Sequence, residues 1–215
     1  FEFSFSVAKQ VRTKTDIGSN PVSFMFTAIT LIKKIFDNIS SKKALVVGSG
    51  YMIQLAIKYL QSNNVRDITL TNRNFDKGSK IAKDNECNYS KLQYLPNIIA
   101  SHDIIISCTS STISIIGKGM MESSISNISA KPFVIIDLGV PRDVEPEISD
   151  LENVYLYSID DLGKVIKNNY KIREQAVAEA EKIIEYKIKD FKIWLDENHS
   201  DNLVKLYRGY VDDIT

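Results

Sequence analysis

Between residues 44 and 157, five short apolar runs alternate with stretches of helical periodicity. The runs at 103–108 and 133–138 are almost continuously β-branched, as strands are when helices cover both faces of a parallel sheet. This alternation predicts an α/β domain built on a doubly wound parallel sheet, the Rossmann architecture. The expected strands are 44–47, 67–71, 103–108, 133–138 and 154–157, and the expected helices between them are 51–61, 76–85, 94–100 and 119–126.

Two helices are expected before this domain. The first follows from the helical spacing of Phe3, Val7 and Val11, and the second begins at Phe24 and ends near Ile35. Between them, the turn-forming residues Gly18, Asn20 and Pro21 are expected to end one helix and cap the next.

A long helix is expected after Asp160, because apolar positions recur at three- and four-residue steps over about forty residues without Pro. Such a helix measures roughly 60 Å, too long for one small domain. It should connect domains or pair with a partner helix; the alternative is a bent helix lying back on the Rossmann domain. A further short helix is expected at 203–214. The stripe comprises Leu162, Ile166, Asn169, Arg173, Ala176, Ala180, Ile183, Lys187, Phe191 and Trp194.

Composition excludes several classes of protein. Lys and Arg number 27, as do Asp and Glu, so no net charge draws the chain to nucleic acid or an anionic membrane, and a nucleic-acid partner would need local contacts. No apolar stretch approaches the ~20 residues of a membrane span, and no signal peptide is recognisable. Two cysteines, Cys87 and Cys108, suit ordinary thiols in a reducing cytoplasm. The chain lacks an initiator Met and is expected to be a fragment.

The segment Gly48-Ser49-Gly50 follows the first strand and precedes a helix, as in a dinucleotide-binding βα unit. Backbone N–H groups at a helix N-terminus attract a pyrophosphate, and Gly allows its close approach. Ile53 occupies the position of the usual third Gly or Ala. We interpret Ile53 as a packing variant that moves the helix slightly outward without touching the phosphate site; a plain strand-to-helix turn is the alternative.

The end of the next strand indicates which dinucleotide is bound. An Asp or Glu there usually binds the ribose 2′-hydroxyl of NAD, whereas this chain has Asn72 and Arg73. Because Arg presents several donors to a 2′-phosphate, NADPH is the favoured cofactor, and Lys77 adds a point charge. The alternative for Arg73 is a solvated loop cation.

Two later strand ends are weaker candidates for the same site. Small hydroxyl residues at 107–112, including Ser110 and Ser111, lie where open α/β sheets bind ligands, unless they form an ordinary turn. Gly139, Val140 and Pro141 should shape a rigid loop near a nicotinamide ring. An ion pair between Arg142 and Asp143 is the structural alternative for that loop.

No catalytic residue is predicted, and no metal site. His102 and His199 have no Ser or Cys partner arranged for nucleophilic catalysis, so both are expected to be structural or solvated. Cys108 lies near the expected cofactor, but no Lys, Arg or His adjoins it to lower its pKa, so we do not expect a nucleophile.

Several blocks of sequence together resemble the glutamyl-tRNA reductase family. They are "FSVAKQVRTKTDIGSNPVS", "VVGSGYMI", "TNRN", "IIGKGM", "DLGVPRDVEPE" and "VYLYSIDDL", in order and at plausible spacing. The resemblance implies reduction of glutamyl-tRNA to glutamate-1-semialdehyde with NADPH, an early step of tetrapyrrole (porphyrin) synthesis. It assigns cofactor binding to Gly48, Ser49, Gly50, Tyr51, Met52, Ile53, Asn72 and Arg73, and more weakly to Ser110, Ser111, Gly139, Val140 and Pro141.

The resemblance also implies a domain organisation. Residues 1–20 would be the last helix of an absent catalytic domain, 21–159 the NADPH domain, 160–200 a spinal helix and 201–215 the start of a truncated dimerisation domain. The family's nucleophilic Cys lies in the absent domain and matches neither Cys87 nor Cys108, so this chain alone should be inactive. Expected partners are glutamyl-tRNA through that domain, a second subunit and a downstream aminomutase.

Two other functions remain open from the sequence. One is another NADP-dependent reductase of the shikimate-dehydrogenase type, whose catalytic residues would also lie in an absent domain. The other is a non-enzymatic dinucleotide-sensing or dimerising module built on the long helix.

Overall fold

The computed structural model describes residues 1–15, 23–126 and 131–212, without the side chains of 170–173, 175 and 197–212. The expected turn residues Gly18, Asn20 and Pro21 lie outside the described residues. Contacts divide the chain into two compact units: Pro21–Lys167, and Phe1–Asn20 together with Asn168–Thr215.

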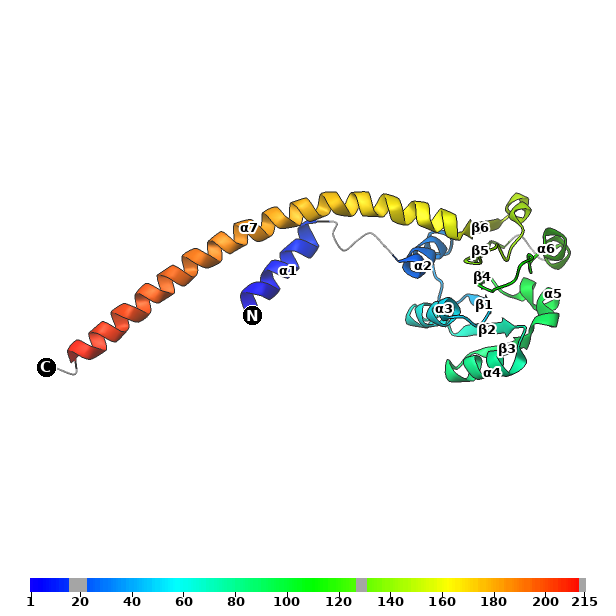
Figure 1. Ribbon diagram of the computed structural model, residues 1–215, viewed down its shortest axis with the longest axis horizontal. Coiled ribbons are helices and arrows are strands. Elements are labelled where there is room, and N and C mark those ends of the chain that lie inside the picture. Colours follow the sequence, from blue (N-terminus) through cyan, green and yellow to red (C-terminus); the bar gives the residue numbers. More distant parts are fainter. Residues whose placement is uncertain (16–22, 127–130, 213–215) are drawn as a thin grey trace. The chain divides into compact units, whose positions relative to one another are not determined.

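The larger unit contains a six-stranded, wholly parallel sheet in the order β3-β2-β1-β4-β5-β6 (Figure 1). Strand order reverses between β1 and β4, the point at which such sheets bind ligands at their carboxyl edge. This confirms the predicted Rossmann fold class. The strands are β1 Lys43–Val47, β2 Asp67–Asn72, β3 Asn88–Lys91, β4 Ile104–Ser107, β5 Phe133–Asp137 and β6 Val154–Ser158.

Helices cover both faces of the sheet (Figure 1). Side chains alternate between faces, so Val46 and Ile106 pack under one layer of helices while Leu45 and Ile105 pack under the other. The first layer contains α2 Phe24–Ile35, α3 Tyr51–Ser62, α4 Phe75–Asp84 and the start of α7 Ile159–Asp212. The second contains α5 Leu95–Ile98, α6 Lys118–Ile125 and the short 3-10 turns η2 Leu92–Tyr94, η3 Ile99–Ser101 and η4 Pro146–Asp150.

The five expected strands are confirmed to within a residue or two, but a sixth, β3, was not predicted. Its sequence, Asn-Tyr-Ser-Lys, has no apolar run, because a short strand at the sheet edge needs little burial. The helix expected at 94–100 is instead the single turn α5 between two 3-10 turns.

The smaller unit pairs α1, Glu2–Lys14, with the later part of α7. The ring of Phe3 lies 4.9 Å from that of Phe191, which stacks on Trp194 at 5.7 Å. Along α7 the predicted stripe includes the buried Ala176 and Ala180, and Leu162 and Ile166 are buried in the larger unit. The stripe residue Arg173 lies outside the described side chains.

The predicted long helix is confirmed, but its end was wrong. Helix α7 continues for 54 residues to Asp212, so no separate helix begins at Leu203. The segment around Asn202 contains neither Pro nor Gly, so nothing in the backbone forces a break there.

Helix α4 approaches the sheet closely at Gly78. A Cβ added there would lie 2.5 Å from the Tyr89 ring and 3.0 Å from Asn72 Cβ. Tyr89 also donates a hydrogen bond from its hydroxyl to the Asn72 carbonyl, at 3.2 Å. The absence of a side chain at Gly78 therefore lets α4 pack against the strand end that carries Asn72.

We predict that Gly78→Ala destabilises the protein. Overpacking costs about 1–3 kcal/mol, which exceeds the gain of about 1 kcal/mol from replacing Gly by Ala in a helix. Urea unfolding of Gly78→Ala and Gly78→Ala/Tyr89→Leu measures this, and the smaller residue at position 89 should recover much of the loss. A single variant more stable than the wild type would contradict the steric argument.

Candidate functional site

The turn after β1 is held tightly to the loop after β4. Gly48 has φ +124°, and a Cβ there would lie 2.3 Å from the carbonyl oxygen of Cys108, so only Gly fits. Gly48 N donates to the Thr71 carbonyl at 2.9 Å, and Cys108 N donates to the Val47 carbonyl at 3.0 Å. These bonds hold the turn at the carboxyl ends of β2 and β4.

The other glycine of the turn faces open space. Gly50 is the N-cap of α3, with no side-chain acceptor for the first N–H groups, and a Cβ there would meet nothing within 4 Å. The first turn of α3 contains no acidic residue that could compete for those groups. An anion can therefore approach the uncapped helix start.

A cavity of about 380 Å³ begins at this turn and reaches the ends of β2 and β4. Gly48, Ser49 and Gly50 form one side, and Asn72, Arg73 and Lys77 supply its polar and cationic end. The remaining lining residues are Val47, Leu92, Cys108, Thr109, Ser110, Ser111 and Ile115.

The cavity brings together seven of the thirteen residues predicted from sequence: Gly48, Ser49, Gly50, Asn72, Arg73, Ser110 and Ser111. Tyr51, Met52, Ile53, Gly139, Val140 and Pro141 do not line it. Ile53 is fully buried and packs in the core beneath the turn, whereas Tyr51 and Val140 are 76% and 73% exposed. Gly139 is buried and Pro141 is exposed, in the loop after β5.

The cationic end of the cavity is organised by local hydrogen bonds. Asn72 donates from its side-chain amide to the Asn74 carbonyl at 3.0 Å, and the Asn74 side chain accepts from Lys77 N at 2.9 Å, capping α4. Among the ion pairs of the described residues, none includes Arg73 or Lys77. Both cations are exposed and are free to meet an anionic ligand.

A buried carboxylate joins the two loops on the other side of the switch point. Asp143 accepts from Ser107 Oγ at 2.8 Å and from Thr109 N at 2.7 Å, and Thr109 Oγ1 also donates to it. Asp143 is fully buried. Through Thr109, which lines the cavity, this carboxylate fixes the 109–115 wall against the loop after β5.

The ion pair between Arg142 and Asp143, given above as the structural alternative for this loop, is not formed. The Asp143 carboxylate points inward to hydroxyl and backbone donors, and none of the ion pairs in the described part of the chain includes Arg142. Nearby, Asp137 accepts from the backbone N–H groups of Gly139, Asp143 and Val144 at 3.0–3.3 Å. Burial is the main cause that raises the Asp137 pKa, against the effect of these bonds.

Cys108 is held as a thiol. Burial raises its pKa, and the charges of Asp143 and Asp137 add to the shift. Burial likewise raises the pKa of Cys87 to about 11. Both thiols are free, and neither environment favours the thiolate that nucleophilic chemistry requires.

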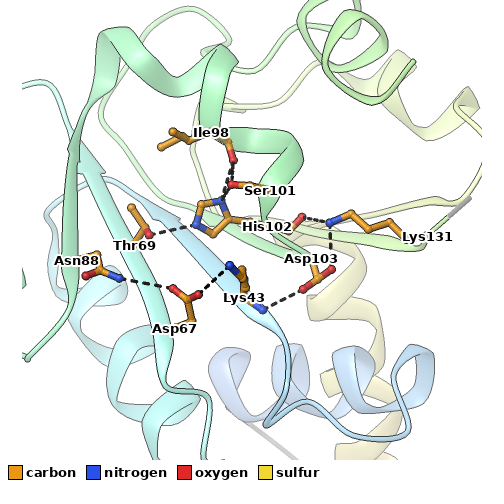
Figure 2. Close-up of polar contacts among 9 residues, drawn as sticks. All are labelled: Lys43, Asp67, Thr69, Asn88, Ile98, Ser101, His102, Asp103 and Lys131. Carbon is orange, nitrogen blue, oxygen red and sulfur yellow. Dashed lines mark hydrogen bonds and ion pairs between the residues drawn. The ribbon is translucent and has the colours of Figure 1, made fainter. Parts of the chain in front are cut away.

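His102 lies at the opposite, amino-terminal edge of the sheet (Figure 2). Its Nδ1 lies 2.8 Å from the Ile98 carbonyl and its Nε2 lies 3.1 Å from Thr69 Oγ1. Because a carbonyl only accepts, Nδ1 carries the proton and Nε2 accepts from Thr69. Burial lowers the His102 pKa. The side chain is structural, as predicted; that of His199 lies outside the described residues.

Ion pairs surround this histidine (Figure 2). Lys43 Nζ lies 3.2 Å from Asp67, and Lys131 Nζ lies 3.1 Å from Asp103, which also accepts from Lys43 N. Charges at the amino-terminal edge are thus paired with one another, in contrast to the cations of the cavity. In the described ranges, no three His, Cys, Asp or Glu side chains gather as metal ligands would, and none of the helices there combines the length and apolar character needed to cross a bilayer.

Four of the lining residues were not singled out from the sequence: Val47, Leu92, Thr109 and Ile115. Leu92 directly follows strand β3. Because that strand was not predicted, there was no reason in the sequence to expect Leu92 at the carboxyl edge of the sheet. Thr109 lies in the hydroxyl-rich segment that was predicted near the ligand, and its adjacency to the strand end was the available signal.

The fold and the cavity define a dinucleotide-binding Rossmann domain. A family model described as Shikimate / quinate 5-dehydrogenase matches residues 30–165, more than half of the chain, so the chain belongs to that family. The match indicates a dinucleotide cofactor.

Among its relatives, the chain is homologous to glutamyl-tRNA reductases. It is 41% identical over 208 residues to that of Psychromonas ingrahamii, covering 97% of this chain and 50% of the relative. It is 38% identical over 214 residues to that of Pseudoalteromonas translucida, covering 100% of this chain and 51% of the relative. The solved glutamyl-tRNA reductase from Methanopyrus kandleri superposes with TM-score 0.84 at 26% identity, over 92% of this chain and 50% of that one. The chain thus spans about half the length of the curated relatives it matches.

We predict that removing the Asp143 carboxylate is strongly destabilising. Asp143→Ala leaves the buried Ser107 Oγ and the half-buried Thr109 donors without their acceptor, which should cost about 3–5 kcal/mol. Asp150→Ala is the matched control, because its carboxylate is exposed and its ion pair with Lys118 should contribute less than about 1 kcal/mol. Chemical denaturation measures both. Equal effects would show that the Asp143 bonds contribute little.

We also predict that His102 makes stability depend on pH. Its folded pKa lies below the unfolded value of about 6.5, so the unfolded chain binds more protons as pH falls below that value. Stability should therefore be fully present above about pH 6.5 and decline on acidification, by at most ~1.4 kcal/mol per pH unit from this group. Comparing urea unfolding of wild type and His102→Gln at pH 7.5 and 5.5 isolates the effect. Identical losses would contradict it.

Proposed function

We propose that this chain is the NADPH-binding part of a glutamyl-tRNA reductase. The complete enzyme would reduce glutamyl-tRNA to glutamate-1-semialdehyde in the tetrapyrrole (porphyrin) pathway. The observation that carries the proposal is the continuous cavity between the glycine turn and the end of β2. Arg73 and Lys77 line that end without an ion pair to any described residue, and no carboxylate lines the cavity. An NAD site would be expected to place an acidic side chain at that strand end.

The residues fit NADPH by their chemistry. Gly50 leaves open the space beside the uncapped start of α3, where a pyrophosphate would accept backbone hydrogen bonds. Arg73 and Lys77, at the end of β2 and the start of α4, would bind the 2′-phosphate. Bound there, the cofactor supplies a hydride.

The hydroxyl-rich wall would hold the other half of the cofactor. Because adenosine would lie toward β2, the nicotinamide half would extend across the switch point to the loops after β4 and β5. Thr109, Ser110 and Ser111 would contact it directly, and Gly139, Val140 and Pro141 would lie beyond. Tyr51, Met52 and Ile53 would support the phosphate-binding turn from the first turn of α3. This part of the protein would bind and orient the cofactor. Neither of its two cysteines lies where the thiolate is favoured, so the nucleophile would come from another domain.

The rest of the reaction would depend on other domains. In this proposal, 1–20 ends the catalytic domain, 21–159 binds NADPH, 160–200 is the spinal helix and 201–215 begins the dimerisation domain. The catalytic domain would contact glutamyl-tRNA, the helix would support a homodimer, and an aminomutase would receive the product. The two free thiols favour a reducing, cytoplasmic location.

A reductase of the shikimate-dehydrogenase type is the second candidate, favoured by the family model. That model covers only 30–165, whereas the similarity to glutamyl-tRNA reductases covers 97% of the chain and so takes in most of α1 and α7 as well. The longer match favours the first candidate.

Titration of the chain with NADPH and NADH tests the cofactor assignment. We expect NADPH to bind more tightly, and Arg73→Ala to weaken NADPH binding about 10- to 100-fold, because a charged hydrogen bond contributes about 1.5–3 kcal/mol. NADH binding should change little, since NADH lacks the 2′-phosphate.

Lys80→Ala is the control, because Lys80 is an exposed cation on α4 that does not line the cavity. It should retain the full preference for NADPH. Equal binding of NADPH and NADH by the wild type would overturn the NADPH assignment.

A further inference from the structure

The unpredicted strand β3 places another cation at the phosphate end of the cavity. Lys91 is the last residue of β3 and is the parallel-register neighbour of Asn72, the last residue of β2. Both residues therefore lie at the carboxyl edge of the sheet, next to Arg73.

A second hollow, of about 450 Å³, continues from the cavity on this side. Asn72, Arg73 and Leu92 line both the cavity and the hollow, whereas Lys77 lines only the first and Lys91 only the second. Arg73 thus lines both the cavity, together with Lys77, and the hollow, together with Lys91.

Aromatic side chains hold Lys91 at this place. Its Nζ lies 5.7 Å from the centroid of the Phe75 ring, and Phe75 packs edge-on against Tyr89 at 5.5 Å. Tyr89 donates to the Asn72 carbonyl, so the aromatic pair is anchored to the strand end. A cation over an aromatic face is weakly held in position.

The charge of Lys91 is not neutralised by a neighbour. Within the described residues, no ion pair includes Lys91, Arg73 or Lys77. A phosphate monoester carries nearly two negative charges at neutral pH, so one guanidinium does not balance it. One carboxylate is also near, because after burial the charge of Asp76 is the second cause that raises the Tyr89 pKa. Three cations and one carboxylate around Asn72 still leave an excess of positive charge that a phosphate monoester would relieve.

We propose that Lys91 is a specificity-determining residue that binds the 2′-phosphate of the dinucleotide together with Arg73 and Lys77. The proposal rests on the NADPH site described above and extends it to a strand that the glycine motif does not predict. The Phe75 ring is the support that keeps the Lys91 ammonium at the rim of the hollow.

Adenosine 2′,5′-bisphosphate and adenosine 5′-monophosphate are the probes, because they differ only in the 2′-phosphate. We expect Lys91→Gln to weaken binding of the bisphosphate about fivefold and to leave the monophosphate within about twofold. Lys91→Arg should keep most of the affinity because it keeps the charge. The difference between wild type and Lys91→Gln should shrink at high salt.

Lys83→Gln is the matched control, since it removes an exposed lysine of α4 that lines neither space. Phe75→Leu should give a smaller, about twofold, loss for the bisphosphate, because the ammonium keeps its charge but loses its support. Circular dichroism of each variant checks that the fold is intact, as expected for exposed positions.

The outcomes separate this proposal from the proposed function. A wild-type protein that prefers the bisphosphate, with a Lys91→Gln variant of unchanged affinity, would overturn the role of Lys91 and leave the NADPH site standing. A wild-type protein that binds both probes equally would overturn the 2′-phosphate site itself. Equal losses from Lys91→Gln and Lys83→Gln would show a general charge effect and would also reject the assignment.

Discussion

The close approach of two loops at Gly48 is the constraint on which the cavity at the carboxyl edge of the sheet depends. The carbonyl of Cys108 occupies the space that any side chain at Gly48 would need. This contact brings the turn after β1 and the loop after β4 together where the strand order reverses. The glycine turn, the hydroxyl-rich wall and the buried Asp143 that holds this wall all lie around this contact.

The two edges of the sheet use charge in opposite ways. At the amino-terminal edge, Lys43 and Lys131 are paired with carboxylates, and a neutral His102 fills the remaining space. At the carboxyl edge, Arg73, Lys77 and Lys91 form no ion pair with another described residue. The buried carboxylates there are satisfied by hydroxyl and backbone donors. Lysines at the amino-terminal edge thus stabilise the fold through ion pairs, whereas the cations around the cavity can interact with a ligand.

Sequence predicted the fold well because its main strands are buried on both faces. The apolar runs at 103–108 and 133–138 predicted central strands, and the structure has them. Gly48 was singled out because its turn was expected to admit a phosphate, whereas the close neighbour in the structure is the Cys108 carbonyl. Strand β3 was not predicted from the sequence, because an edge strand is stabilised mainly by hydrogen bonds to its neighbour and needs no apolar run. The role of Asp143 escaped because its partners, Ser107 and Thr109, are 34 or more residues away in sequence. The assignment of individual residues to cofactor contacts stays a prediction.

The contact between Gly78 and Tyr89 limits which substitutions can be accepted at these two positions during evolution. The two positions share one volume, so a larger residue at 78 is compatible only with a smaller one at 89. Substitutions at these positions should therefore appear as pairs among relatives, with glycine opposite an aromatic residue or a small side chain opposite an aliphatic one. Such exchanges would alter the support of Phe75 and the neighbouring strand ends, and so could retune the affinity for the adenosine end of a dinucleotide while the glycine turn stays the same.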